Sequence, residues 1–149
     1  MNRGGGWLVA GGILSVIASL IHLACIALGA SWFRFFGAPE PLVAAYERGD
    51  MQLVWMTVAI ALVLAIWAAY AFSGAGLLRR LPLLRTGLVV ICAIYLARGA
   101  ILFPALINAP YPGSTFDIWS SGIVLLYGAA YTIGTWLAWS ALRPGRSAS

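Results

Sequence analysis

The chain has 149 residues, of which 62% are hydrophobic and only 9% are charged. A soluble globular domain carries roughly 25% charged residues, so this composition excludes an ordinary soluble protein. It also excludes a disordered chain, because disordered segments are polar and rich in charge. The length fits one domain, residues 1–149.

Four long apolar blocks make up most of the chain. They run from Trp7 to Ala30, from Leu53 to Phe72, from Thr86 to Ile107 and from Ile118 to Leu142. A helix needs about 20 mostly apolar residues to cross a bilayer. The blocks are continuous rather than alternating, which argues against barrel strands, and helices satisfy their own backbone hydrogen bonds in lipid. The sequence therefore predicts an all-α membrane protein, a bundle of four transmembrane helices.

The arginines predict the orientation of this bundle. The chain has no lysine, and its N-terminus, the loop between the second and third blocks, and the C-terminal tail hold most of the arginines. By the positive-inside rule, both termini are expected in the cytoplasm. All four acids fall on the opposite side: Glu40, Glu47, Asp50 and Asp117. The net charge of +5 fits this orientation and contact with anionic lipids, and it is too dispersed for a nucleic-acid partner.

The first outer loop, Ser31 to Gln52, is the longest connection. It opens with an aromatic run from Trp32 to Phe36, which is expected at the membrane interface. Pro41 is suited to begin a short interfacial helix that extends through Glu47, with Gly49 ending it. Six of the tryptophans lie near span ends, where their rings favour the headgroup region: Trp7, Trp32, Trp55, Trp119, Trp136 and Trp139.

Arg98 is the most informative single residue, because it lies inside the third apolar block. An arginine within a membrane span costs several kcal/mol and usually faces the bundle interior or a wet cavity. Tyr95 lies three residues earlier, on the same helix face. Two interpretations of Arg98 remain open. It either belongs to a binding site, or it snorkels to the outer headgroups with Glu47 or Asp50 as its partner.

His22 is the second candidate, and it is the only histidine in the chain. Gly12, Ser15, Ser19 and His22 share one face of the first span, because they recur at steps of three and four residues. Such a stripe is typical of a close helix–helix contact in membranes. The functional alternative is a histidine that lines a cavity as a proton carrier or ligand contact. The candidate ligand-binding residues are His22, Tyr95, Arg98, Glu47 and Asp50.

Catalytic and metal-binding motifs are not found in the sequence. There is no Ser/His/Asp arrangement, phosphate loop or metal-ligand cluster, so no catalytic residue, metal or cofactor is predicted, and enzyme activity stays open. Cys25 and Cys92 are predicted not to form a disulfide, because their depths in the membrane differ by roughly 18 Å.

Two further stretches support a resemblance. Residues Arg34 to Glu40 read RFFGAPE, and residues Ser73 to Pro82 read SGAGLLRRLP. With the four-span layout, the chain resembles small, uncharacterised bacterial four-helix proteins of the inner membrane with DoxX-like architecture. The resemblance implies a location in the bacterial inner membrane and no particular activity.

Three functions remain open from the sequence. The first is binding of a lipid or hydrophobic small molecule in the outer half of the bundle, with Arg98 at the head group and Tyr95 and His22 orienting it. The second is an accessory or assembly subunit that docks on a membrane-complex partner or on copies of itself. The third is a small proton-coupled transporter or membrane enzyme that uses His22.

Overall fold

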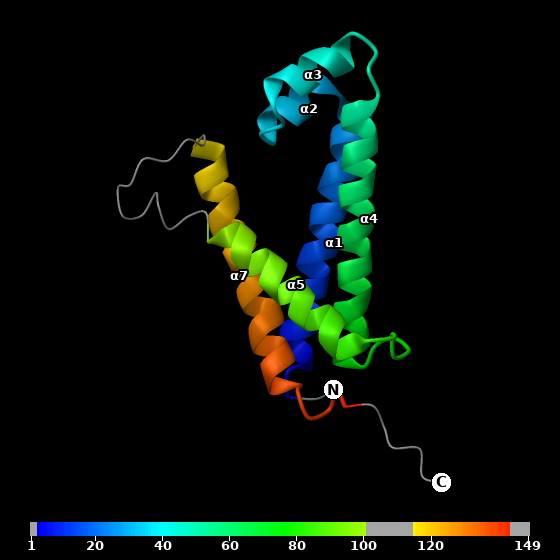
Figure 1. Cartoon of the computed structure of the whole chain (residues 1–149), viewed down its shortest axis with the longest axis vertical. Coiled ribbons are helices and arrows are strands. Elements are labelled where there is room, and N and C mark those ends of the chain that lie inside the picture. Colours follow the sequence, from blue (N-terminus) through cyan, green and yellow to red (C-terminus); the bar gives the residue numbers. More distant parts are fainter. Residues whose placement is uncertain (1–2, 101–114, 144–149) are drawn as a thin grey trace.

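The computed structural model describes residues 3–100 and 115–143 (Figure 1). Within these ranges the chain is helical, as predicted. The helices are α1 (Gly5–Leu28), α2 (Ala30–Phe35), α3 (Glu40–Glu47), α4 (Gln52–Ala75), α5 (Leu84–Gly99) and α7 (Thr115–Leu137).

The long helices form two antiparallel pairs. Helix α1 lies along α4, and α5 lies along α7 (Figure 1). The pairs meet where α1 begins, α4 passes into α5 and α7 ends, and they diverge toward α2 and α3. We call the meeting end the basic end, because it holds Arg79, Arg80, Arg85 and Arg143, and we call the other end the capped end.

Three of the described helices are long and apolar enough to cross a membrane: Gly5–Leu28, Gln52–Ala75 and Phe116–Leu137. They correspond to the first, second and fourth predicted blocks and indicate a multi-pass membrane protein. The third predicted block begins within α5, and its residues 101–107 lie outside the described part of the chain. The fourth block was drawn too far, because α7 ends at Leu137 and residues 138–142 form turns.

The cap, residues 29–51, contains the predicted short helix, α3, and a second helix that was not predicted, α2. Gly29 separates α1 from α2 with a φ of 82°, a conformation that glycine adopts without steric cost. The chain therefore turns at Gly29, and the first span stops at Leu28 instead of Ala30. A small core of Cys25, Phe33, Val43 and Leu53 holds the cap on the ends of α1 and α4.

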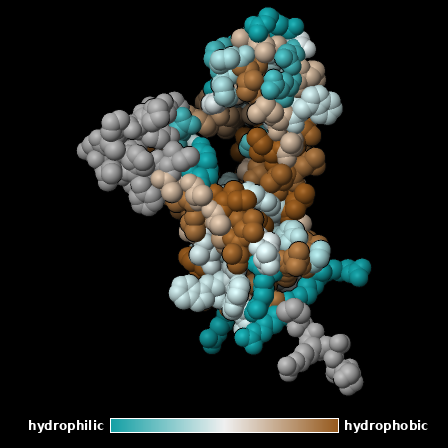
Figure 2. All heavy atoms as spheres, viewed as in Figure 1, coloured by the Kyte–Doolittle hydropathy of each residue, from teal (hydrophilic) through white to brown (hydrophobic). Residues whose placement is uncertain are grey.

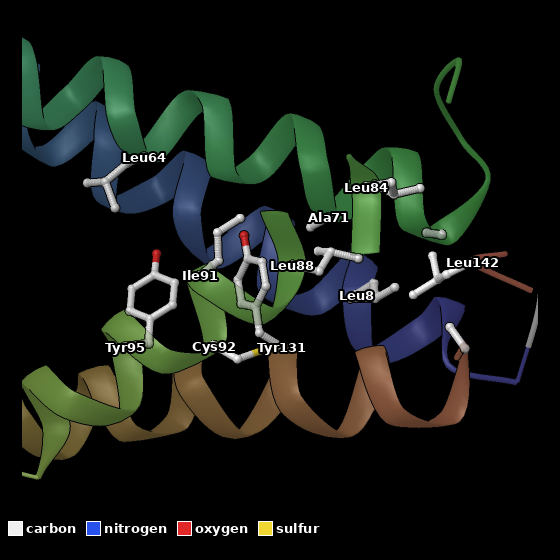
Figure 3. Packing of buried hydrophobic residues seen from close by; sticks show 12 residues of the cluster. Leu8, Leu64, Ala71, Leu84, Leu88, Ile91, Cys92, Tyr95, Tyr131 and Leu142 are labelled. Carbon is white, nitrogen blue, oxygen red and sulfur yellow. The ribbon is translucent and has the colours of Figure 1, made fainter. Parts of the chain in front are cut away.

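The main core lies nearer the basic end, where the two helix pairs meet (Figure 3). Leu8, Leu88 and Tyr131 are fully buried there. Small residues let the backbones approach closely, as is usual between helices in membranes. At Gly134, an added Cβ would lie 2.9 Å from the backbone nitrogen of Leu8, so α1 and α7 cross in direct backbone contact.

The surface between the two ends is apolar, with hydrophilic residues gathered toward the cap and the basic end (Figure 2). The six tryptophans predicted near span ends are all exposed, and Trp136 is the most exposed at 79%. Trp67, in contrast, packs edge-on against Tyr95 inside the bundle. In water this apolar belt would drive aggregation, whereas in a bilayer it is the surface that contacts lipid.

We expect Gly134→Ala to lower the stability of the bundle. The new methyl group would collide with the Leu8 backbone, and such overpacking costs about 1–3 kcal/mol. Gly122→Ala on the same helix is the matched control, because no described atom lies within 4 Å of its added Cβ. Thermal unfolding in detergent, followed by near-UV circular dichroism, measures both variants, and equal midpoints would contradict the close crossing.

Candidate binding groove between the helix pairs

A chain of three hydrogen bonds joins all four long helices at the centre of the bundle. The Ser15 hydroxyl on α1 lies 2.9 Å from the Tyr95 hydroxyl on α5 and 2.9 Å from the Tyr131 hydroxyl on α7. The Tyr131 hydroxyl lies 3.0 Å from the backbone carbonyl oxygen of Trp67 on α4. Figure 3 shows the hydroxyls of Tyr95 and Tyr131 directed toward α1 and α4.

The carbonyl of Trp67 decides the direction of this chain. A carbonyl oxygen only accepts, so Tyr131 donates its single proton to Trp67. Tyr131 must then accept the proton of Ser15, and Ser15 must accept the proton of Tyr95. The hydroxyls of Tyr95, Ser15 and Tyr131 thus each donate one hydrogen bond to a defined acceptor. A polar group in lipid needs such a partner, because no water is present to replace it.

Aromatic rings surround this chain. The ring of Tyr95 packs against Trp67, Tyr127 and Tyr131, with centroid distances of 4.8, 5.6 and 5.4 Å. The pairs with Trp67 and Tyr127 are edge-to-face, and such pairs add about 0.5–1.5 kcal/mol each to the burial of the rings. The aromatic cluster of Trp67, Tyr95, Tyr127 and Tyr131 is therefore a rigid floor on which α4, α5 and α7 meet.

A groove of about 360 Å³ lies beside this floor, between the two helix pairs. Helix α4 contributes one wall from Ala59 to Trp67, and α5 contributes Ile94, Tyr95 and Arg98. The surface that faces the groove is entirely apolar, so Arg98 and Tyr95 line it with carbon atoms, while their polar groups bond to Ser120, Ser121 and Ser15. Ile60, Val63 and Ile94 are also exposed, so the groove opens onto the lipid-facing surface.

Arg98 lies at the groove, held from α7. One terminal guanidinium nitrogen donates to the Ser121 hydroxyl at 2.8 Å, and the other donates to the Ser120 hydroxyl at 3.3 Å. Ser120 in turn donates to the backbone carbonyl of Asp117. Arg98 lies 14 residues after the start of α5, roughly 21 Å along the helix from the basic end, so it is nearer the capped end.

The structure brings Tyr95 and Arg98 to one groove, where they make different contacts. The Tyr95 hydroxyl is bonded to Ser15, and the Tyr95 ring lines the groove. His22 is not among the described residues that line the groove. Its Nδ1 lies 2.7 Å from the carbonyl oxygen of Ala18 on the same helix, so Nδ1 carries the proton that it donates.

The predicted stripe on α1 is a helix–helix contact along most of its length. An added Cβ at Gly12 would lie 2.6 Å from the Phe72 ring, and Ser19 donates to the carbonyl of Ala61 at 2.8 Å. Ser15 anchors the central hydrogen-bond chain. Three of the four stripe residues therefore hold α1 against its neighbours.

The structure gives the two acids that were considered for Arg98 other partners. Glu47 accepts two hydrogen bonds from Arg34, at 2.9 and 2.8 Å, and Arg34 also holds Glu40 at 2.9 Å. Asp50 accepts the backbone N–H of Gln52 at the start of α4, at 2.8 Å. Both acids thus stabilise the cap instead of contacting the groove.

Sequence reasoning missed Ser120 and Ser121 as partners of Arg98. The signal was present, because a serine pair opens the fourth block at the depth of Arg98 once α5 and α7 run antiparallel. The order of the helices along the chain does not show that α5 and α7 are neighbours. The serine pair could therefore be assigned to Arg98 only after the packing of the helices was known.

Comparison with protein-family models, with curated proteins and with solved structures finds no match. The class therefore follows from the fold alone, which is that of a small multi-pass membrane protein. Among the described residues, no group of three or more His, Cys, Asp or Glu is placed to hold a metal ion. Cys25 and Cys92 are separate, buried thiols.

Replacing Ser15 with alanine should loosen the meeting point of the four helices. Ser15→Ala removes two interhelical hydrogen bonds and leaves the Tyr95 hydroxyl without its acceptor. Such bonds in membrane proteins contribute about 0.6 kcal/mol on average and up to about 1.7 kcal/mol. We expect a lower midpoint of thermal unfolding in detergent, and no change for the exposed Ser140→Ala. Equal midpoints for the two variants would show that the hydrogen bonds of Ser15 contribute nothing to stability.

The stability of the cap should depend on pH through Arg34. The guanidinium holds the pKa of Glu40 and of Glu47 below the ordinary value of 4.5. A carboxyl group whose pKa is lower in the folded state than in the unfolded state contributes its full stabilisation when the pH is above the unfolded-state pKa. That contribution disappears as the pH falls through the folded-state pKa. The unfolding midpoints of the wild type and Arg34→Gln should therefore differ at neutral pH and converge in acid below pH 4.5. A difference that persists unchanged in acid would contradict this assignment.

Proposed function

We propose that this protein is a four-span protein of the bacterial inner membrane that binds a lipid or another hydrophobic small molecule in the groove beside Arg98. The single observation that carries the proposal is the position of Arg98. Arg98 borders an apolar groove that opens onto the apolar surface of the bundle, and in the proposed four-span topology this groove lies within the membrane. Because such a placement is costly, it is expected where an anionic or strongly polar group is to be held.

The proposed topology rests on the arrangement of the ends. Helix α1 begins and α7 ends at the same end of the bundle, which requires an even number of crossings (Figure 1). Helix α5 starts at that end as well, and its 16 described residues would extend roughly 24 Å, most of the way across a bilayer core of about 30 Å. The arginines gather at this end, so both termini are assigned to the cytoplasm.

The groove separates two tasks between its residues. Arg98 supplies hydrogen-bond donors and positive charge for the head group, and Ser120 and Ser121 fix its direction through two hydrogen bonds. The wall from Ala59 to Trp67 on α4, with Ile94 on α5, accepts an acyl chain or another apolar body. Tyr95 supports the site from below through its bond to Ser15.

The cap reaches from α1 and α4 to the start of α7, at the capped end of the groove. An added Cβ on Gly37 would lie 2.2 Å from the ring of Phe116, so the loop between α2 and α3 contacts the start of α7. The Arg34 clamp on Glu40 and Glu47 fixes this loop on α3. We therefore assign Glu47 and Asp50 to the cap that closes the site, and we place His22 on α1 outside the contact with the ligand.

The test is native mass spectrometry of the protein extracted gently from its own membrane. We expect a discrete bound small molecule that Arg98→Gln reduces at least about tenfold, because a hydrogen bond to a charged group contributes about 1.5–3 kcal/mol. Arg48→Gln, an exposed arginine of the cap, is the matched control and should retain the molecule.

A second variant separates loss of binding from loss of folding. Ala59 lines the groove and is exposed, so Ala59→Phe fills the groove without removing Arg98 or its serine partners. It should also release the molecule while the unfolding midpoint stays unchanged. A wild-type protein that carries no small molecule, or one that arrives with another polypeptide, would overturn the proposal and favour an accessory subunit.

A further inference from the structure

A second groove lies toward the basic end of the bundle, on the pair formed by α5 and α7. Its volume is about 410 Å³, and it is lined by Val89 and Cys92 of α5, by Thr132, Thr135 and Trp136 of α7, and by Trp139 in the turn after α7. Val89, Trp136 and Trp139 are exposed at 47%, 79% and 43%, so this groove also opens onto the lipid-facing surface.

Arg85 lies at the mouth of this groove. Its guanidinium carbon is 4.3 Å from the centroid of the Trp139 ring, and a terminal nitrogen donates to the backbone carbonyl of Trp139. Cys92 is seven residues further along α5, so the groove extends roughly 10 Å from the arginine into the membrane. The order along the membrane normal is thus charge, then an indole ring, then an apolar slot.

Two more guanidinium groups gather at the same turn. Arg80 donates to the carbonyl of Leu142, and the exposed Arg143 follows directly in the chain. The acceptors shown for Arg80 and Arg85 are neutral carbonyls in the turns that follow α7, so these hydrogen bonds leave the positive charge uncompensated. The Nε of Arg85 is buried without a hydrogen-bond partner in the described residues.

The acidic residues of the chain lie far from this turn. Three of them belong to the cap, and Asp117 lies in the first turn of α7, 19 residues before Trp136 and roughly 28 Å away along the helix. None of the four acidic side chains, all of which lie within the described residues, can therefore neutralise Arg85 or Arg143. The phosphate of a lipid headgroup would supply the negative charge that these side chains do not.

We infer that this groove is a binding site for an anionic phospholipid, with the phosphate at Arg85 and Arg143 and an acyl chain against Val89, Cys92 and Trp136. Charge complementarity selects the head group, because basic pockets between helices on the cytoplasmic side attract anionic lipids. The shape of the groove selects a lipid over a soluble phosphate, since only a lipid fills the apolar slot. The site is independent of the groove at Arg98.

The experiment compares two lipids with identical acyl chains, phosphatidylglycerol and phosphatidylcholine, titrated onto the detergent-solubilised protein and counted by native mass spectrometry. The wild type should retain phosphatidylglycerol in preference to phosphatidylcholine. Arg85→Gln and Arg143→Gln should each weaken phosphatidylglycerol binding about fivefold, which corresponds to the roughly 1 kcal/mol per basic residue at an anionic surface. Arg48→Gln, at the capped end, should leave it unchanged.

Two comparisons keep the inference distinct from folding and from the groove at Arg98. Arg143 is exposed, so Arg143→Gln tests the charge with the Arg85 contacts to Trp139 intact. Arg98→Gln should not alter the preference, and glycerol 3-phosphate should not displace the bound lipid. Equal retention of the two lipids, a preference that survives Arg85→Gln and Arg143→Gln, or displacement by glycerol 3-phosphate would overturn the inference.

Discussion

The hydroxyl of Ser15 is the point at which the four long helices are joined. It accepts from Tyr95 and donates to Tyr131, and Tyr131 donates to the backbone of Trp67. In a bilayer there is no water to replace a missing partner, so this chain constrains the relative rotation of α1, α4, α5 and α7 together. A shift of any one of these helices would leave a hydroxyl unpaired in an apolar medium.

The rest of the architecture follows from that joint. Below it, toward the basic end, small residues such as Gly134 bring the helices into backbone contact and close the core. Above it the helix pairs diverge, and the aromatic floor formed with Trp67 borders a groove instead of a packed interior. Arg98 lies at that groove, and Arg85 lies at the opposite end of α5. Helix α5 thus has an arginine beside each of the two grooves, Arg85 near its start and Arg98 near its end.

Arg98 shows how far the sequence reached into the candidate site. Its cost in an apolar block identified it, and the three-residue spacing placed Tyr95 beside it. Its partners were not predictable, because Ser120 and Ser121 lie on another helix and a serine pair in an apolar block is equally typical of packing. Glu47 was considered for Arg98 because it lies on the same side of the membrane, but Arg34 reaches it first within the cap.

Hydropathy alone determined that this is a helical membrane protein, and it located the spans that the structure describes to within a few residues, because about 20 apolar residues can only cross lipid as a helix. The distribution of arginine predicted which ends belong together. Only the tertiary structure decided that Ser15 faces two tyrosines, that His22 bonds to its own helix, and that grooves open at Arg98 and beside Arg85. The reason is physical, since the membrane selects apolar residues without regard to their order, whereas the contacts depend on the rotation and crossing of helices, which side-chain packing and hydrogen bonds set across the bundle.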